Sequence, residues 1–330
     1  MQHSLACLSP LAQPRTGIAR LAAESPQVRE RAQVAYFALP VRSALNRESS
    51  GNKPFVWTLN PYRGCEFGCK YCYARYTHEF MEKWDGLDFE RKIYAKVGSP
   101  ALLRAELRRA QDKGLPIALG SATDPFQPAE KQFEITRRLL AAFAEFEGLR
   151  LSIVTKSTLV TRDLDLLKLL SRRHRLSIHV TVTTTDEHLA RLLEPKAPPP
   201  ARRLEAVRKL VSDGIYAGVN AMPIMPEIND SPTALEDLAR QAAAAGARFM
   251  HGNTLYLMPA ALRQFMPFLE KEFPHLVRLY RKLYARSAYL PKDYQEKIAD
   301  RVAILRARYN LIGPGPQAPT LSGPTQLALW

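Results

Sequence analysis

Residues 60–80 read NPYRGCEFGCKYCYARYTHEF and place Cys65, Cys69 and Cys72 in the spacing C-x3-C-x2-C. Three thiolates on one short loop can hold a single metal centre, and Gly64 and Gly68 relieve the backbone where it must wrap. A four-iron cluster normally takes four thiolates, so a cluster held here would leave one iron open to another ligand. The alternative is a structural zinc ion with His78 as its fourth ligand. Spacing alone favours the iron–sulfur cluster, because the chain offers no second C-x2-C pair.

Outward from this loop, strand-like and helix-like segments alternate. We expect strands at 55–60, 116–121, 151–156, 176–184, 216–224 and 248–257, and helices between them at 131–146, 161–173, 201–214 and 232–246. A further strand–helix pair is expected at 91–97 and 99–114. Short apolar strands separated by amphipathic helices predict βα units around a parallel sheet. The pattern fits either a doubly wound sheet or an incomplete barrel.

The cysteine loop resembles the signature of radical S-adenosylmethionine (SAM) enzymes, with Tyr71 as the aromatic residue before the last cysteine. The text NPYRGC and CKYCYAR resembles the spore photoproduct lyase-like branch of that superfamily and its uncharacterised members. The resemblance runs from about Val56 to about Pro259. It implies an α/β fold of the incomplete (β/α)6 TIM-like barrel type in place of a doubly wound sheet.

Four regions are expected on this basis. They are an N-terminal extension at 1–53 with one short helix near 26–33, a radical SAM core at 54–260, a helical C-terminal region at 261–310 and a flexible tail at 311–330. Within the C-terminal region, residues 275–290 interleave arginines and tyrosines. Such a helix could grip phosphates and stack bases, or it could be amphipathic with a basic exposed face.

The resemblance also implies the chemistry. Cys65, Cys69 and Cys72 would bind three irons of a [4Fe–4S] cluster, and the fourth iron would chelate the amino and carboxylate groups of SAM. An electron from a reductant such as flavodoxin or ferredoxin would cleave SAM to methionine and a 5′-deoxyadenosyl radical. That radical would abstract hydrogen from a substrate that the sequence does not identify. No separate catalytic residue is assigned.

Polar residues at strand ends are the candidates for SAM contacts, because chemistry gathers at the carboxyl ends of strands in both candidate folds. The resemblance places Ser121, Thr123 and Asp124 near the methionine end of SAM, where hydroxyls and a carboxylate suit an ammonium group. The resemblance also implies that Lys156 contacts the carboxylate of SAM. The structural alternatives are a helix-starting turn for Asp124 and a solvent-reaching side chain for Lys156.

Three further contacts are implied. Tyr71 would pack near the adenine, Thr183 aligns with a SAM-binding serine of the lyases, and Asn220 lies on a segment that matches the family's adenine-contacting strand. Core packing for Tyr71 and ordinary strand propensity for Thr183 are the alternatives. Arg202 or Arg203 could serve the substrate or simply flank a helix.

One position departs from the lyases. Their hydrogen-donor cysteine aligns with Ser121, and a hydroxyl hydrogen is far harder to abstract than a thiol hydrogen. We therefore do not predict a photoproduct lyase. A DNA-repair lyase acting on pyrimidine dimers remains the first alternative, and a zinc-organised nucleic-acid-binding module remains the second.

The amino-acid composition limits the classes of binding partner that we expect. The 330 residues include 47 basic and 32 acidic side chains, a net charge of +15, which favours polyanionic partners such as nucleic acid. No run approaches the roughly 18 apolar residues of a membrane span, so no membrane partner is expected. The first residues, MQHSLACLSPLAQPR, lack the pattern of a signal peptide, and a cytoplasmic location is expected. Cys7 stands apart from the cluster loop, and its role is open.

Overall fold

The computed structural model describes residues 15–31, 33–48, 53–110 and 116–316. Cys7 lies outside these ranges, so its role stays open. Among the described residues, no helix combines the length and the apolar character that crossing a membrane requires.

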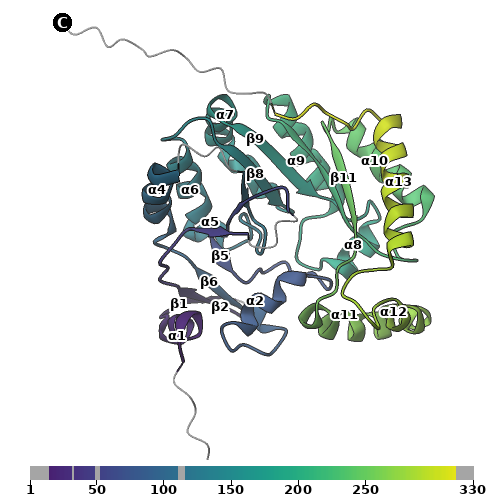
Figure 1. The fold of residues 1–330 in the computed structure, drawn as a ribbon, viewed down its shortest axis with the longest axis horizontal. Helices are drawn as coiled ribbons and strands as arrows, with labels where there is room; N and C mark the ends of the chain where they lie inside the picture. The colour runs from purple at the N-terminus through teal and green to yellow at the C-terminus, as the bar shows by residue number, and fades with distance from the viewer. Residues whose placement is uncertain (1–14, 32, 49–52, 111–115, 317–330) are drawn as a thin grey trace, which may run out of the picture.

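A seven-stranded sheet forms the centre of the molecule, with the strand order β11-β10-β9-β8-β7-β4-β3 (Figure 1). Its strands are β3 Leu45–Arg47, β4 Trp57–Leu59, β7 Ile117–Leu119, β8 Arg150–Thr155, β9 Arg175–Thr181, β10 Ala217–Ile224 and β11 Met250–Thr254. From β4 to β11 each strand pairs in parallel with the next one in the sheet, and β3 adds an antiparallel edge. This unreversed order is that of a barrel, since a doubly wound sheet reverses order at a switch point. The two edges stay apart, so the predicted incomplete (β/α)6 barrel is confirmed.

Helices cover one face of this sheet. They are α4 Ser99–Ala110, α5 Glu130–Phe133, α6 Ile135–Phe143, α7 Leu164–Arg173, α9 Pro200–Ser212 and α10 Pro232–Ala244, with a 3-10 helix η3 at Thr158–Asp163. Helix α8 Glu187–Leu193 instead packs into the apolar cluster around the cysteine loop. The strand residues under them are apolar. Ile153, Ile178 and Val219 are 1%, 0% and 0% exposed. This face supplies most of the core, as expected for strands that alternate with amphipathic helices.

The other face of the sheet is polar. Ser152 pairs with Ser177, and Asn220 pairs with His251. His179 follows Ser177 by two residues and therefore lies on the same face. These side chains are only partly covered, except for the buried Asn220. Because they line the concave side of an open barrel, this face is the one available to a ligand.

A second, four-stranded sheet has the order β1-β2-β6-β5, with β1 Gln27–Arg31, β2 Val34–Ala38, β5 Tyr62–Arg63 and β6 Lys92–Ala95. The strand predicted at 91–97 therefore forms, but it pairs with β2 and not with the barrel. The helix predicted near 26–33 is wrong, because this segment is a strand whose side chains are all exposed. A helix there would have no apolar face to bury. Helix α1 at Gly17–Glu24 lies beside this sheet (Figure 1).

The predicted helical C-terminal region is confirmed. It contains α11 Pro259–Glu272, η4 Pro274–Leu276, α12 Val277–Leu283 and α13 Lys292–Arg308. Base stacking by Tyr280 and Tyr284 is wrong, because these side chains are 0% and 8% exposed and donate to main-chain carbonyls. The arginines face solvent. Of the predicted tail, Leu311 and Gly313 bond to the start of β11, and residues 317–330 lie outside the described ranges.

Candidate metal centre and cofactor site

The cysteine loop follows β5 and runs into the 3-10 helix η1 at Tyr73–Arg75 and helix α2 at Tyr76–Glu79. Cys65 and Cys69 are buried, Cys72 is partly exposed, and all three are free thiols. The loop backbone is fastened from two sides. The amide of Cys65 donates to the carbonyl of Phe89 at 2.9 Å, and Arg75 donates to the carbonyl of Cys69 at 3.0 Å. The thiols are thus held by main-chain contacts that do not use the sulfur atoms.

Two glycines permit this path. Gly64 has a φ of +84°, and a Cβ atom there would lie 2.8 Å from the carbonyl oxygen of Phe89. Gly68 has a φ of +64°, and its Cβ would lie 2.6 Å from a carboxylate oxygen of Glu90. Each position combines a left-handed backbone with a close neighbour, so only glycine fits without strain.

The donor set suits a metal centre. Burial is the largest cause that raises the pKa of the Cys65 thiol well above its usual value, and burial raises the pKa of Cys69 to about 12. Thiolates at these positions therefore need a strong local positive charge, which bound iron supplies. Three soft thiol donors on one loop fit an iron–sulfur cluster. In the described part of the chain, no three His, Cys, Asp or Glu side chains converge on a position for a single metal ion.

His78, the fourth ligand in the zinc alternative, belongs to another environment. Its Nε2 atom lies 3.0 Å from the carbonyl oxygen of Lys92. Its ring packs edge-on against Phe89 and Tyr94. Burial lowers the pKa of this imidazole to about 4. These contacts hold the ring between Phe89 and Tyr94, and its Nδ1 atom is buried with no hydrogen-bond partner among the described residues.

Three predicted SAM contacts from separate segments meet around the carboxylate of Glu194. The hydroxyl of Thr183 donates to Glu194 Oε1 at 2.8 Å, and the hydroxyl of Tyr71 also donates to this oxygen. Lys156 Nζ lies 4.0 Å from the same oxygen and 5.7 Å from the centre of the Tyr71 ring. The lysine is therefore positioned beside the cysteine loop, as its neighbour Tyr71 belongs to that loop.

Arg203 completes this group. Its Nη1 atom lies 2.5 Å from Glu194 Oε2, and both side chains are 1% exposed. Burial on its own would raise the pKa of Glu194, but the charges of Arg203 and Lys156 outweigh it and lower that pKa. Glu194 therefore stays ionised. Sequence reasoning missed its role, although Glu194 stands directly before Pro195 in the segment 194–204, which resembles the family.

Asp124 links two strand ends. Its carboxylate accepts hydrogen bonds from the amide of Phe126 at 2.9 Å, the hydroxyl of Thr155 at 2.7 Å and the amide of Lys156 at 2.6 Å. These hydrogen bonds connect the turn after β7 to the end of β8, and Lys156 is the first residue after β8. The hydroxyl of Thr123 donates to the carbonyl of Gly64 at 2.6 Å and so supports the cysteine loop. SAM contacts by Thr123 and Asp124 stay predictions.

Ser121 and Asn220 lie apart from the Glu194 group. The hydroxyl of Ser121 accepts a hydrogen bond from Asn60 at 3.1 Å. The amide oxygen of Asn220 lies 3.3 Å from His179 Nδ1, on the polar face of the sheet. The ring of His179 stacks with that of His251 at 5.8 Å. Sequence reasoning missed both histidines, since the strand register alone brings them together.

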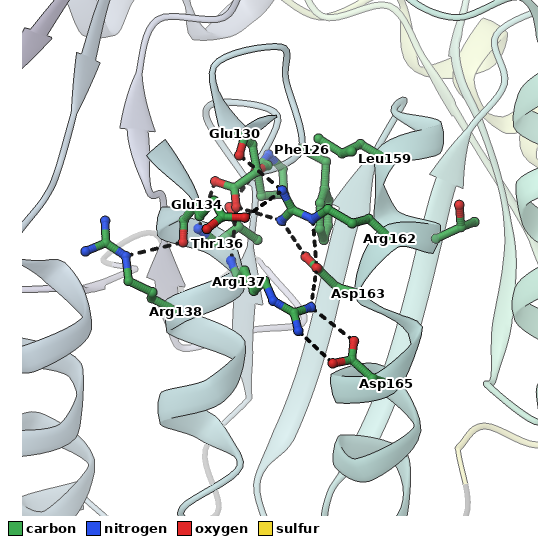
Figure 2. Close-up of polar contacts among 12 residues, drawn as sticks. Phe126, Glu130, Glu134, Thr136, Arg137, Arg138, Leu159, Arg162, Asp163 and Asp165 are labelled. Carbon is green, nitrogen blue, oxygen red and sulfur yellow. Dashed lines mark hydrogen bonds and ion pairs between the residues drawn. The ribbon is translucent and has the colours of Figure 1, made fainter. Parts of the chain in front are cut away.

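An ion-pair network braces the loops behind the site (Figure 2). Glu130, which is 0% exposed, accepts hydrogen bonds from Tyr62 of β5 and from Arg162 of η3. Asp163 pairs with Arg162 and with Arg137, each at 2.7 Å. The network joins the start of the cysteine loop to the segments that follow β7 and β8. It therefore fixes the loops that carry Asp124 and Lys156 relative to the thiols.

Fold and site together define a partial barrel with a loop of three free cysteines at the carboxyl ends of its strands. The sequence model of the Radical SAM superfamily matches residues 59–239, and the chain belongs to this superfamily. An uncharacterized protein of Mycobacterium tuberculosis is 37% identical over 287 residues, which cover 87% of this chain and 84% of that protein. An uncharacterized protein of Methanocaldococcus jannaschii is 31% identical over 222 residues, which cover 66% of this chain and 76% of that protein.

The fold is also that of a solved enzyme. A spore photoproduct lyase variant with bound SAM and dinucleoside spore photoproduct superposes with a TM-score of 0.63 at 16% identity, over 83% of this chain and 79% of that chain. The superfamily implies a [4Fe–4S] cluster and SAM as cofactors. The chain is therefore an enzyme of the radical SAM class.

Proposed function

We propose that the protein binds a [4Fe–4S] cluster through Cys65, Cys69 and Cys72, cleaves SAM reductively and abstracts hydrogen from a substrate. The bound cluster supplies the electron that breaks the sulfonium bond of SAM. The observation that carries the proposal is the placement of three free thiols beside the buried group of Lys156, Glu194 and Arg203. The three thiols would hold the cluster, and the Lys156 ammonium group, which Glu194 only partly neutralises, would meet the carboxylate of SAM.

The roles of the protein residues follow from these contacts. Lys156 offers its ammonium group to the SAM carboxylate, and Glu194 holds that ammonium in place. Tyr71 packs near the adenine, with its hydroxyl fixed by Thr183 and Glu194. Asp124 positions Lys156 through the main-chain amide of the lysine. The apolar surroundings of Cys65, Cys69 and Tyr71 exclude water from the reacting atoms.

The remaining predicted contacts belong to the same proposal. Ser121 and Thr123 lie in the turn after β7 and would bound the methionine end of SAM, and Asn220 would face the adenosyl group from the polar face of the sheet. Residues 54–260 would form the SAM-binding unit, flanked by 1–53 and 261–310. A flavodoxin or ferredoxin would supply the electron in the cytoplasm.

A second candidate is a DNA lyase that repairs photoproducts. The net charge of +15 favours it, and the structurally similar lyase binds a dinucleoside photoproduct. Ser121 speaks against it, because the hydroxyl cannot replace a thiol as hydrogen donor. Turnover of a dinucleotide photoproduct by the purified enzyme would favour this candidate over an unrelated substrate.

The test uses anaerobically reconstituted protein with dithionite and SAM. We expect 5′-deoxyadenosine to form with the wild-type chain and with Cys7→Ala, which keeps all three loop thiols. The triple variant Cys65→Ala/Cys69→Ala/Cys72→Ala should form none. Tightly bound zinc with no deoxyadenosine from the wild-type chain would contradict the proposal and favour a zinc-organised nucleic-acid-binding module.

A further inference from the structure

A groove of about 470 Å³ lies at the small sheet, outside the cofactor site. Helix α1 borders it at Thr16 and Gly17, and the segment after β2 borders it at Arg42 and Ser43. Arg63 of β5 and Lys96 also line it. Strands β2 and β6 are parallel and both end at this point. The carboxyl ends of parallel strands commonly form the crevice in which α/β proteins bind ligands.

Lys96 is the decisive residue. Its side chain lines the groove and the residue is only 7% exposed. Within the described residues, its ammonium group has no hydrogen-bond acceptor and no ion-pair partner. Burial, and secondarily the charge of Arg63, lowers the pKa of Lys96 to about 7. A buried ammonium group without an anion is costly, and a negatively charged ligand in the groove would offset that cost.

Arg63 adds a second cation. One guanidinium nitrogen donates to the carbonyl of Thr77 at 3.3 Å, but the buried Nε atom has no partner among the described residues. Arg42 is exposed and forms no ion pair in the same part of the chain. Two further arginines at the rim are already paired, Arg15 with Glu82 and Arg20 with Glu24. Arg42, Arg63 and Lys96 therefore remain free to meet an anion.

The main chain contributes donors as well. Helix α1 begins at Gly17, and the side chain of Thr16 does not cap it. Amides in the first turn of a helix lack intrahelical partners and carry the positive end of the helix dipole. Thr16, Gly17 and Ile18, at the start of this helix, line the same groove as Lys96. A helix N-terminus combined with cations is the arrangement that binds phosphate groups.

No carboxylate competes for the groove. Its lining contains no acidic residue among those described. Glu106 approaches the neighbouring segment, but its carboxylate accepts hydrogen bonds from the amides of Ala44 and Leu45 at 2.8–3.2 Å. From these observations we propose that the groove between α1 and the ends of β2 and β6 is a phosphate-binding site, with Lys96 and Arg63 at its base. The ligand is a phosphate group, present either as a monoester or within a phosphodiester.

The test is isothermal titration of the full chain with inorganic phosphate in a chloride buffer of constant ionic strength. Wild type should bind phosphate saturably. Lys96→Met should bind at least about tenfold more weakly, because a charge-assisted hydrogen bond is lost. Lys131→Met, which removes an exposed lysine on α5, should bind as wild type does. Competition by a hexanucleotide without terminal phosphates identifies a phosphodiester ligand, and its failure identifies a monoester.

A melting curve separates binding from folding. Lys96→Met should melt at the same or a higher temperature than wild type in chloride alone, because it removes a buried unpaired charge. Wild type should melt higher in phosphate than in chloride, and Lys96→Met should lose this difference. Absence of saturable phosphate binding to wild type, or unchanged affinity in Lys96→Met, would overturn the proposal. Neither result would affect the radical SAM assignment.

Discussion

Arg203 Nη1 lies 2.5 Å from Glu194 Oε2, and each of the two side chains is 1% exposed. The other oxygen of Glu194 accepts the hydroxyls of Tyr71 and Thr183 and faces Lys156. One buried carboxylate therefore fixes side chains from three separate strand–loop segments. Arg203 supplies the charge that allows the carboxylate to remain ionised in this position.

Breaking this pair should destabilise the fold. Replacing Arg203 by Met leaves Glu194 as a buried charge opposed only by Lys156, which should lower the free energy of unfolding by about 3–5 kcal/mol. Arg202→Met changes the exposed neighbour and should cost within about 0.5 kcal/mol. Urea denaturation of both variants measures the difference. Equal midpoints for the two variants would show that the pair does not stabilise the protein.

Lys156→Met should weaken SAM binding. The ammonium group is expected to make a charge-assisted hydrogen bond, worth about 1.5–3 kcal/mol, so the dissociation constant should rise by roughly tenfold to a hundredfold. Equilibrium dialysis with labelled SAM measures it, and the iron content should stay at the wild-type value. Lys131→Met is the matched control. Unchanged SAM affinity in Lys156→Met would remove this residue from the cofactor site.

Gly64→Ala should disrupt the cysteine loop. The residue has a φ of +84°, and a Cβ would lie 2.8 Å from the Phe89 carbonyl oxygen. The substitution should cost more than about 1 kcal/mol of stability and reduce the iron retained after reconstitution. Gly98→Ala serves as the control, because its Cβ would meet nothing within 4 Å. Full iron loading of Gly64→Ala would contradict the close fit of this loop.

Burial of His78 should make the free energy of unfolding depend on pH. Burial lowers its pKa from 6.5 to about 4, so the unfolded chain takes up a proton before the folded one does. The stabilisation is complete above pH 6.5 and is lost as pH falls through this window, by up to about 3 kcal/mol. His78→Gln should reduce the slope of the unfolding free energy against pH between pH 6.5 and 4, and His179, whose pKa burial also lowers to about 4, contributes to the slope that remains. His188→Gln, at an exposed position, should leave it unchanged. A slope in His78→Gln equal to that of wild type would contradict this assignment.

Most of the barrel could be predicted from sequence because its strands are apolar and its helices are amphipathic. Ile153 and Ile178 show this pattern, and the units they belong to formed as predicted. The small sheet could not be predicted in the same way. Strand β1 carries only exposed side chains, and its pairing with β2 is a main-chain interaction. The sequence of strand β6 resembles that of a barrel strand, and its pairing with β2 and β5 places it in the small sheet.

The candidate site likewise contains one part that local sequence predicts and another that depends on tertiary contacts. The cysteine spacing is local, so the ligand loop could be predicted with its residues. Glu194 and Arg203 meet by tertiary packing across the turn between α8 and α9, and no periodicity marks that contact. His179 and His251 meet through the register of β9, β10 and β11. Contacts of this kind follow from strand pairing, which a single sequence does not specify.

Electron paramagnetic resonance of the dithionite-reduced, reconstituted protein, before and after addition of SAM, tests the proposed cluster most directly. We expect the signal of a reduced [4Fe–4S] cluster that changes when SAM is added, because SAM would supply ligands to the iron that lacks a cysteine. Cys72→Ser should lose or strongly alter the signal. An iron signal that is identical with and without SAM, or no cluster signal from the wild-type chain, would contradict the proposal.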